Sequence, residues 1–244
     1  MSNIIKNYLK ETRFVVSKKT SSIYSEEESV ICDILESAWY ILMKFKDKYD
    51  SEGDKPIVAS FSLLTKSINS ILASYELCVE GYIIESGVLL RHIIEAICVS
   101  YDIYINEDRF KDFLYNKEKF KSTKSIEPTK NLIPEIGIIY GILTEFNTHI
   151  STLNCFPNLT KVKGDNVEFF IGGGILTSEE EYEGIKGEIY QIFLVAIRIL
   201  QLTEYIFKDY VSELEMWKNI NNRLVIYPCD KYAYWIKKIA REFQ

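Results

Sequence analysis

Two histidines and one arginine are the first candidates for chemistry in this chain. Only His92 and His149 are present, and Arg91 directly precedes the first of them. Histidine exchanges a proton near neutral pH, and a guanidinium offers five hydrogen-bond donors to a phosphate or a carboxylate. Glu95 follows Arg91 by four residues, so the two lie on one face of a helix. Arg91, His92 and Glu95 are therefore candidate catalytic residues for acid–base chemistry on an anionic substrate.

A second set of polar side chains lies in the segment YGILTEFNTHIS. Tyr140 and His149 fall on neighbouring parts of one helix, and Asn147 flanks the same surface. If this helix packs against the helix that holds Arg91 and Glu95, Tyr140 and His149 join them in one buried polar site. The alternative is structural, with Arg91 and Glu95 as an internal ion pair that fixes helix packing. The sequence leaves both interpretations open.

Motifs for other kinds of catalysis are missing from the sequence. It has no HExxH motif and no paired Glu-x-x-His helices, the patterns that hold zinc and di-iron centres. It has no GxSxG motif, and the run Gly172 to Gly174 lacks the lysine of a phosphate-binding loop. We expect no metal site and no cofactor.

The elements that position these residues are predicted to be helices. Ser70 to Tyr104 is a nearly continuous apolar stretch that contains a few charged residues, among them Arg91 and Glu95. Burying a charge costs several kcal/mol unless it is paired, so these two residues serve either structure or chemistry. We predict one helix over about 60–79, a joint or kink at Gly81, and a second helix over about 82–105.

Composition and periodicity favour an all-α fold, a single multi-helix bundle of seven to eight helices. Hydrophobic residues make up 47% of the chain, and it has only eleven glycines and five prolines. We predict one helical domain over 1–244, with N-terminal helices in 1–50, a core bundle in 58–212 and a C-terminal helical segment in 213–244. Further helices are expected over about 25–48, 107–121, 134–154 and 177–210, with a loop over 121–130 and a small β-hairpin or ordered loop near 158–174. A capping box of Ser25 and Glu28 would begin the first of these helices.

Charge and cysteine content limit the partners and the compartment. The net charge of −6 argues against sequence-independent binding of nucleic acids, non-specific DNA binding included, because such binding depends on lysine and arginine. One local basic patch is interrupted by Glu118 and Glu127, which is more typical of a solvated helix end than of an RNA-binding surface. The patch consists of Lys117, Lys119, Lys121, Lys124 and Lys130. The N-terminus lacks a signal-peptide pattern, and no apolar run reaches the length of about 18 residues that spans a bilayer. Five cysteines without a CxxC pair fit a reducing cytosol, so we expect a cytoplasmic protein with no membrane partner.

One segment resembles a group of uncharacterised bacterial proteins. LLRHIIEA, Leu89 to Ala96, follows Gly81-Tyr82 and precedes a Tyr-x-x-Leu-Thr...His element by some forty residues. Over about 60–210 the chain is similar to helical proteins with a Leu-Leu-Arg-x-x-x-Glu helix, which are often compared with HEPN-type bundles. HEPN ribonucleases resemble one another through an arginine followed after four to six residues by a histidine. Here no arginine has a histidine at that spacing, and Thr144 to His149 is one residue longer than expected.

The resemblance implies binding or cleavage of RNA or nucleotides, in bacterial stress or phage defence. In a metal-independent ribonuclease, either histidine would take the proton of the 2′-hydroxyl, Arg91 would stabilise charge on the phosphorane and Glu95 would orient Arg91. The alternative is a non-catalytic helical scaffold or antitoxin-like interaction module, because aromatic residues, which are enriched at protein interfaces, make up 14% of the chain. A homodimer or a partner protein is possible in either case.

Overall fold

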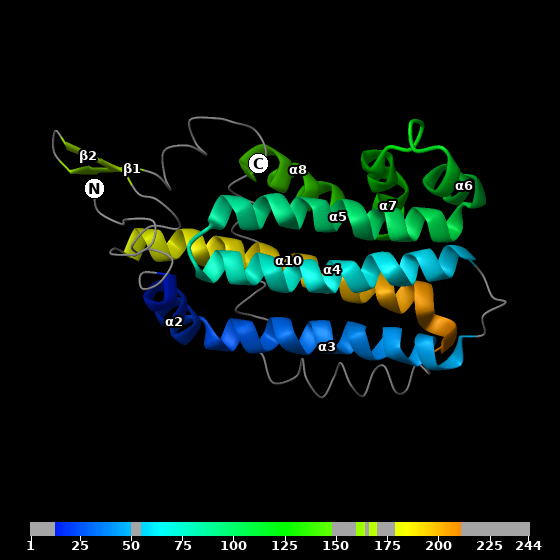
Figure 1. Cartoon of the computed structure of the whole chain (residues 1–244), viewed down its shortest axis with the longest axis horizontal. Helices are drawn as coiled ribbons and strands as arrows, with labels where there is room; N and C mark the ends of the chain where they lie inside the picture. The colour runs from blue at the N-terminus through cyan, green and yellow to red at the C-terminus, as the bar shows by residue number, and fades with distance from the viewer. Residues whose placement is uncertain (1–12, 50–54, 148–159, 164–165, 170–178, 211–244) are drawn as a thin grey trace, which may run out of the picture.

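Four long helices form the body of the protein (Figure 1). The computed structural model describes residues 13–49, 55–147, 160–163, 166–169 and 179–210. The long helices α3 (Ser25–Lys48), α4 (Lys55–Val79), α5 (Ile83–Ile105) and α10 (Glu179–Phe207) lie side by side along the length of the molecule. The prediction of an all-α bundle is confirmed, with eight α-helices in the described residues.

Apolar side chains repeated every three or four residues build the core. On α3, Val30, Ile34, Ala38 and Ile41 are buried, and α10 packs against α3, α4 and α5. The predicted boundaries of α3 are confirmed, but the capping box is wrong. Tyr24 is the residue before the helix and its side chain caps nothing, while Glu28 accepts a hydrogen bond from the Tyr75 hydroxyl at 2.8 Å.

A tight turn at Gly81 joins α4 to α5. Gly81 has a φ of 89°, which only glycine adopts without strain. Its N–H donates to the carbonyl of Cys78 at 2.9 Å and the N–H of Tyr82 donates to that of Leu77 at 2.8 Å, the pattern of a Schellman motif. The predicted joint is therefore confirmed. Helix α4 begins at Lys55, earlier than predicted, because Pro56 is tolerated in the first turn of a helix.

Four shorter elements cover one side of α5. They are α6 (Glu107–Tyr115), the 3-10 helix η2 (Ser122–Ser125), α7 (Ile126–Leu132) and α8 (Glu135–Asn147), and each contacts α5. In Figure 1 they lie on the side of α5 away from α3. Asn106 caps α6, since its side chain accepts from the N–H groups of Asp108 and Arg109.

Two sequence predictions in this region are wrong. The helix predicted over 107–121 ends at Tyr115, where the Asn116 amide donates to the carboxylate of Asp112 at 2.9 Å. The loop predicted over 121–130 contains η2 and the start of α7. Pro128 fits in the first turn of α7, and the burial of Ser125, Ile126 and Thr129 fixes this segment against the bundle.

The remaining described elements lie at the ends of the bundle and in a strand pair. They are α2 (Arg13–Ile23), which contacts α3 and α4, and the 3-10 helix η3 (Lys208–Tyr210) after α10. Strands β1 (Thr160–Lys163) and β2 (Asn166–Phe169) pair antiparallel, with Thr160 opposite Phe169. The predicted C-terminal segment 213–244 lies outside the described residues.

Two helical stretches, Lys55–Val79 and Ile185–Tyr210, are long and apolar enough to cross a membrane by length and composition alone. This differs from the prediction, which counted only continuous apolar runs. Both stretches contribute side chains to the core of the bundle, among them Leu64 and Ile71 of the first and Ile192 and Ile199 of the second. More than half of the apolar window in Ile185–Tyr210 is buried inside the protein, but less than half of that in Lys55–Val79. Two such helices are weak evidence for a membrane.

Candidate functional site

Two carboxylates on one face of α5 make most of the polar contacts between α5 and the short elements that cover it. Glu95 and Asp102 are seven residues apart, two helical turns, so both face the layer formed by α6, η2, α7 and α8. Each accepts a hydrogen bond from a serine of η2: Ser122 donates to Glu95 at 2.7 Å, and Ser125 donates to Asp102 at 2.7 Å. Each carboxylate also pairs with an arginine.

The first of these groups joins Arg91, Glu95 and Tyr140. The Arg91 Nη2 lies 3.3 Å from Glu95 Oε1 and donates to the Tyr140 hydroxyl at 3.1 Å. That hydroxyl donates to Glu95 Oε1 at 3.1 Å. The guanidinium carbon of Arg91 also lies 5.5 Å from the centre of the Tyr140 ring. The structure thus brings together three of the residues predicted to meet, and α8 lies against α5 as that prediction requires.

The other predicted site residues do not join this group in the described part of the chain. His92 is exposed, whereas Arg91 and Glu95 are half-buried. Asn147 is the last residue of α8 and its side chain lies outside the description, as does the whole of His149. Their proposed roles in proton transfer stay predictions.

The Arg91 group is a closed set of contacts. Glu95 accepts from Arg91, Tyr140 and Ser122, and its side chain is 14% exposed. Arg91 is 24% exposed, and its Nε is buried without a partner in the described residues. The guanidinium is therefore held mainly by its own carboxylate, the arrangement expected of an internal ion pair. An anionic ligand would have to compete with Glu95.

The second group, which sequence reasoning missed, is centred on Arg109. The Nε of Arg109 donates to Asp102 Oδ2 at 2.8 Å, and its Nη2 donates to the Ser125 hydroxyl at 3.1 Å and to the Lys121 carbonyl at 3.2 Å. The Phe120 ring lies 4.4 Å from the guanidinium carbon. Asp102 is 5% exposed, so this ion pair is largely withdrawn from water. An aspartate inside the apolar run to Tyr104 was the signal in the sequence.

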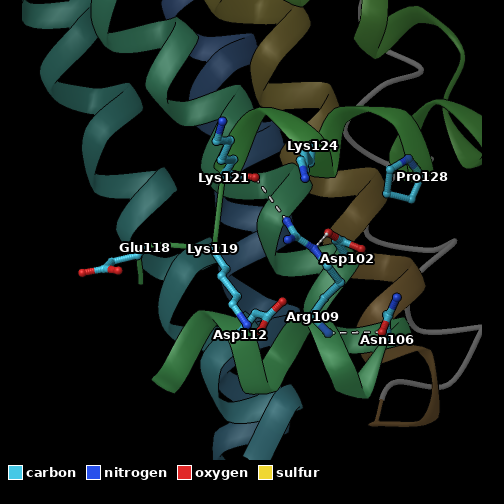
Figure 2. A pocket seen from close by; sticks show the side chains of 9 residues that line it. All are labelled: Asp102, Asn106, Arg109, Asp112, Glu118, Lys119, Lys121, Lys124 and Pro128. Carbon is cyan, nitrogen blue, oxygen red and sulfur yellow. Dashed lines mark hydrogen bonds and ion pairs between the residues drawn. The ribbon is translucent and has the colours of Figure 1, made fainter. Parts of the chain in front are cut away.

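A cavity of about 680 Å³ opens beside Arg109 (Figure 2). Three exposed lysines, Lys119, Lys121 and Lys124, line it, and none has an ion pair with a described residue. In Figure 2 the Glu118 side chain points away from the other side chains. The complete lining is Asp102, Asn106, Arg109, Asp112, Glu118, Lys119, Lys121, Lys124 and Pro128.

Burial raises the pKa of the Cys98 thiol, which lies between the two carboxylates on α5. Desolvation is the largest cause and raises this pKa to about 12. A hydrogen bond from Thr129 lowers it, and the charges of Glu95 and Asp102 make smaller contributions that raise it. A thiol of this kind stays protonated at neutral pH, so Cys98 is a packing residue and not a nucleophile.

A separate polar cluster lies in the core where α10 meets α4 and α5. Glu188 is 1% exposed, and burial raises its pKa to about 8, although a hydrogen bond with Ser86 lowers it. Ser86 in turn lies 2.8 Å from the hydroxyl of Ser74. The Glu188 Oε1 has no partner in the described residues. Burial and the nearby Glu188 also raise the pKa of Cys78.

Among these groups, the cavity beside Arg109 has the charges that suit recognition of an anion. No group of three or more histidine, cysteine or acidic residues in the described part of the chain is arranged to hold a metal ion. Comparisons with protein-family models, curated proteins and solved structures find no match to this chain. The cavity beside Arg109 has exposed lysines that form no ion pair with a described residue, whereas Arg91 is already paired with Glu95.

Proposed function

We propose that this protein binds RNA or nucleotides through their phosphate groups, in the cavity between α6, η2 and α7. The observation that supports this most is that Lys119, Lys121 and Lys124 line one cavity with Arg109 and have no ion pair with a described residue. Phosphate contacts from lysine and arginine supply most of the affinity of proteins for RNA that is independent of sequence.

The local charge favours this proposal despite the acidic chain. Residues 109–130 contain seven basic and three acidic side chains, in a protein whose net charge is −6. The basic surface is thus concentrated in one segment. Since interactions between exposed charges fade beyond about 8 Å at physiological salt, a ligand at the cavity experiences this local charge more than the net charge.

An exposed aromatic residue close to the lysines in the sequence suits the binding of a single strand. Tyr115, at the end of α6, is 76% exposed, and Lys117 follows it two residues later. Single-stranded RNA binds where basic groups track the phosphates and aromatic rings stack on bases. Tyr115 is therefore proposed to stack on a base next to the bound phosphate.

Binding of a labelled single-stranded RNA, followed by fluorescence polarisation, tests the proposal. A triple variant with Lys119, Lys121 and Lys124 changed to Gln is expected to bind at least about tenfold more weakly. The slope of log affinity against log salt concentration should also become shallower by about 2, since three phosphate contacts are lost. The control changes three exposed lysines of other helices, Lys18, Lys46 and Lys66, to Gln. An equal loss in both variants would contradict the proposal, because the net charge and not the cavity would then set the affinity.

Cleavage of the bound RNA is a second step of the same proposal. The link between Arg91 and the cavity is the turn η2, where Ser122 donates to Glu95; Arg91 itself does not line the cavity, so Glu95 would have to release it for this step. Metal-independent cleavage with Arg91 stabilising the phosphorane would continue in excess chelator, and Arg91→Lys would slow it while leaving RNA affinity unchanged. Intact RNA after prolonged incubation with the wild type limits the function to binding. A cytoplasmic location in bacteria, a role in stress or phage defence, and dimerisation belong to the proposal as predictions from the sequence.

A further inference from the structure

The guanidinium of Arg109 is fixed in one orientation by its surroundings. Its Nε and Nη2 donate to Asp102, Ser125 and the Lys121 carbonyl, and Phe120 lies against it. The remaining nitrogen, Nη1, has no partner among the described residues, and Arg109 lines the cavity. A guanidinium held in this way presents two N–H donors at a defined place without losing further side-chain entropy on binding.

We infer that this cavity binds a terminal phosphomonoester with its attached ribose, as at the 5′ end of an RNA or in a mononucleotide. The inference rests on the proposed function and specifies its ligand. The cations provide the first argument. Arg109 and the three lysines surround one cavity, and a phosphomonoester has a charge of about −1.5 to −2 and three acceptor oxygens at neutral pH. An internal phosphodiester has a single charge and fewer free oxygens, so it uses this set of donors less completely.

The acidic residues of the cavity provide the second argument. Asp102 is neutralised by Arg109, and Glu118 points away. Asp112 is half-buried in the lining, and one of its carboxylate oxygens accepts from Asn116 at 2.9 Å. Its other oxygen, Oδ2, has no partner in the described part of the chain. A carboxylate repels a phosphate but accepts a hydrogen bond from a hydroxyl, so Asp112 suits a ribose hydroxyl next to the bound phosphate.

The size of the cavity agrees with a nucleotide. Its volume of about 680 Å³ lies in the range of about 300–1,000 Å³ typical of small-molecule sites. Inorganic phosphate would leave most of this space and Asp112 unused.

The test compares two RNAs of one sequence, with a 5′-phosphate or a 5′-hydroxyl and the label at the 3′ end. We expect the wild type to prefer the 5′-phosphate at least about tenfold, since hydrogen bonds to a charged phosphate are about twice as strong as neutral ones. The preference should shrink below about pH 6, where the phosphate takes up a proton. The double variant Lys121→Gln, Lys124→Gln should lose the preference, while Lys46→Gln, Lys66→Gln should keep it.

Competition identifies the part of the ligand that is recognised. Adenosine monophosphate should displace the labelled RNA at a much lower concentration than inorganic phosphate, and Asp112→Asn should reduce that advantage. Equal binding of the two RNAs would overturn the inference and leave the proposed function standing. Failure of the wild type to bind either RNA would remove the proposed function itself. Equal competition by inorganic phosphate would overturn the assignment of ribose to Asp112. Circular dichroism on each variant confirms that it is folded.

Discussion

The hydroxyl of Ser122 donates to Oε2 of Glu95 at 2.7 Å, which ties a short turn in the middle of the sequence to the centre of a core helix. Three residues later, Ser125 makes the matching bond to Asp102 at 2.7 Å. The turn η2 is thus attached at both ends to one face of α5. Two of the lysines that line the cavity, Lys121 and Lys124, directly precede these two serines, so their positions depend on the carboxylates of α5.

Loss of the Ser122 hydroxyl should measurably destabilise the protein. Ser122→Ala removes one donor to a half-buried carboxylate, and we expect the free energy of unfolding to fall by about 1–2 kcal/mol. Ser62→Ala is the matched control, since that exposed hydroxyl donates only to the carbonyl of Val58 at 3.1 Å in its own helix. Urea unfolding followed by circular dichroism measures both. A loss no larger for Ser122→Ala than for Ser62→Ala would show that the bond adds no stability.

Tyr140 and Glu95 should be energetically coupled. Tyr140→Phe removes the hydroxyl that accepts from Arg91 and donates to Glu95, at an expected cost of about 1 kcal/mol. In a double-mutant cycle with Glu95→Gln, the loss of unfolding free energy in the double variant should differ from the sum of the two single losses by at least about 0.5 kcal/mol. Tyr75→Phe serves as the control, because the Tyr75 hydroxyl donates to Glu28 instead. Additive losses would show that Tyr140 and Glu95 contribute to stability independently of each other.

Removal of the Asp102 charge should weaken both the fold and the binding of phosphate. Asp102→Asn leaves the Arg109 guanidinium, which is 16% exposed, without its counter-charge, and we expect a loss of roughly 3 kcal/mol in unfolding free energy. RNA affinity should fall as well, because Arg109 is no longer held in place. Asp108→Asn is the control, since Asp108 is exposed and lies 3.9 Å from Lys111. Unchanged stability in Asp102→Asn would mean that the Asp102–Arg109 ion pair contributes nothing net.

Glu188 should make stability fall as the pH rises from about 5 to about 8. Burial raises its pKa from the ordinary value of 4.5 to about 8 in the folded protein. Between these values the folded protein retains a proton that the unfolded chain has released, so each pH unit lowers the unfolding free energy by about 1.4 kcal/mol. Below this window both states are protonated, and above it both are ionised, so the decline stops.

Glu188→Gln should remove the contribution of Glu188 to this pH dependence, while Glu204, whose pKa burial raises to about 7, keeps its own. The advantage of the variant over the wild type in unfolding free energy should grow from pH 5 to pH 8 and then level off, and urea titrations at each pH measure it. Glu85→Gln, at an exposed position of α5, should keep a constant difference from the wild type. A constant difference for Glu188→Gln would mean that the buried carboxyl ionises like an exposed one.

The long helices could be predicted because their residues repeat with the helical period. The boundaries of α3 agree with the prediction, and α5 begins at Ile83, one residue from the predicted start. The predicted loop 121–130 failed for a physical reason. Helix α7 has only seven residues, too few to form a stable helix by itself, so contacts such as that of Ser125 with Asp102 determine its structure.

The candidate site shows the same division between local and long-range information. Arg91 and Glu95 could be paired from their spacing, and Tyr140 could be brought to them by assuming that two apolar helices pack. The pairing of Asp102 with Arg109 crosses the junction between α5 and α6, where the cap at Asn106 turns the chain. No periodicity encodes that turn. The lysines are visible in the sequence, but the cavity that they line forms only because the chain turns at Asn106.

The glycine turn between α4 and α5 also determines the order in which the chain can fold. These two helices are neighbours in sequence and pack along their length, with Gly81 as the only residue of positive φ described between them. Such a hairpin closes a short loop and can form while the ribosome is still making the rest of the protein. Helix α10 packs on α3, α4 and α5 but begins about a hundred residues after the turn. Until α10 is synthesised, the nascent chain exposes the apolar faces that α10 later covers, and at this stage it is most exposed to aggregation and to chaperones.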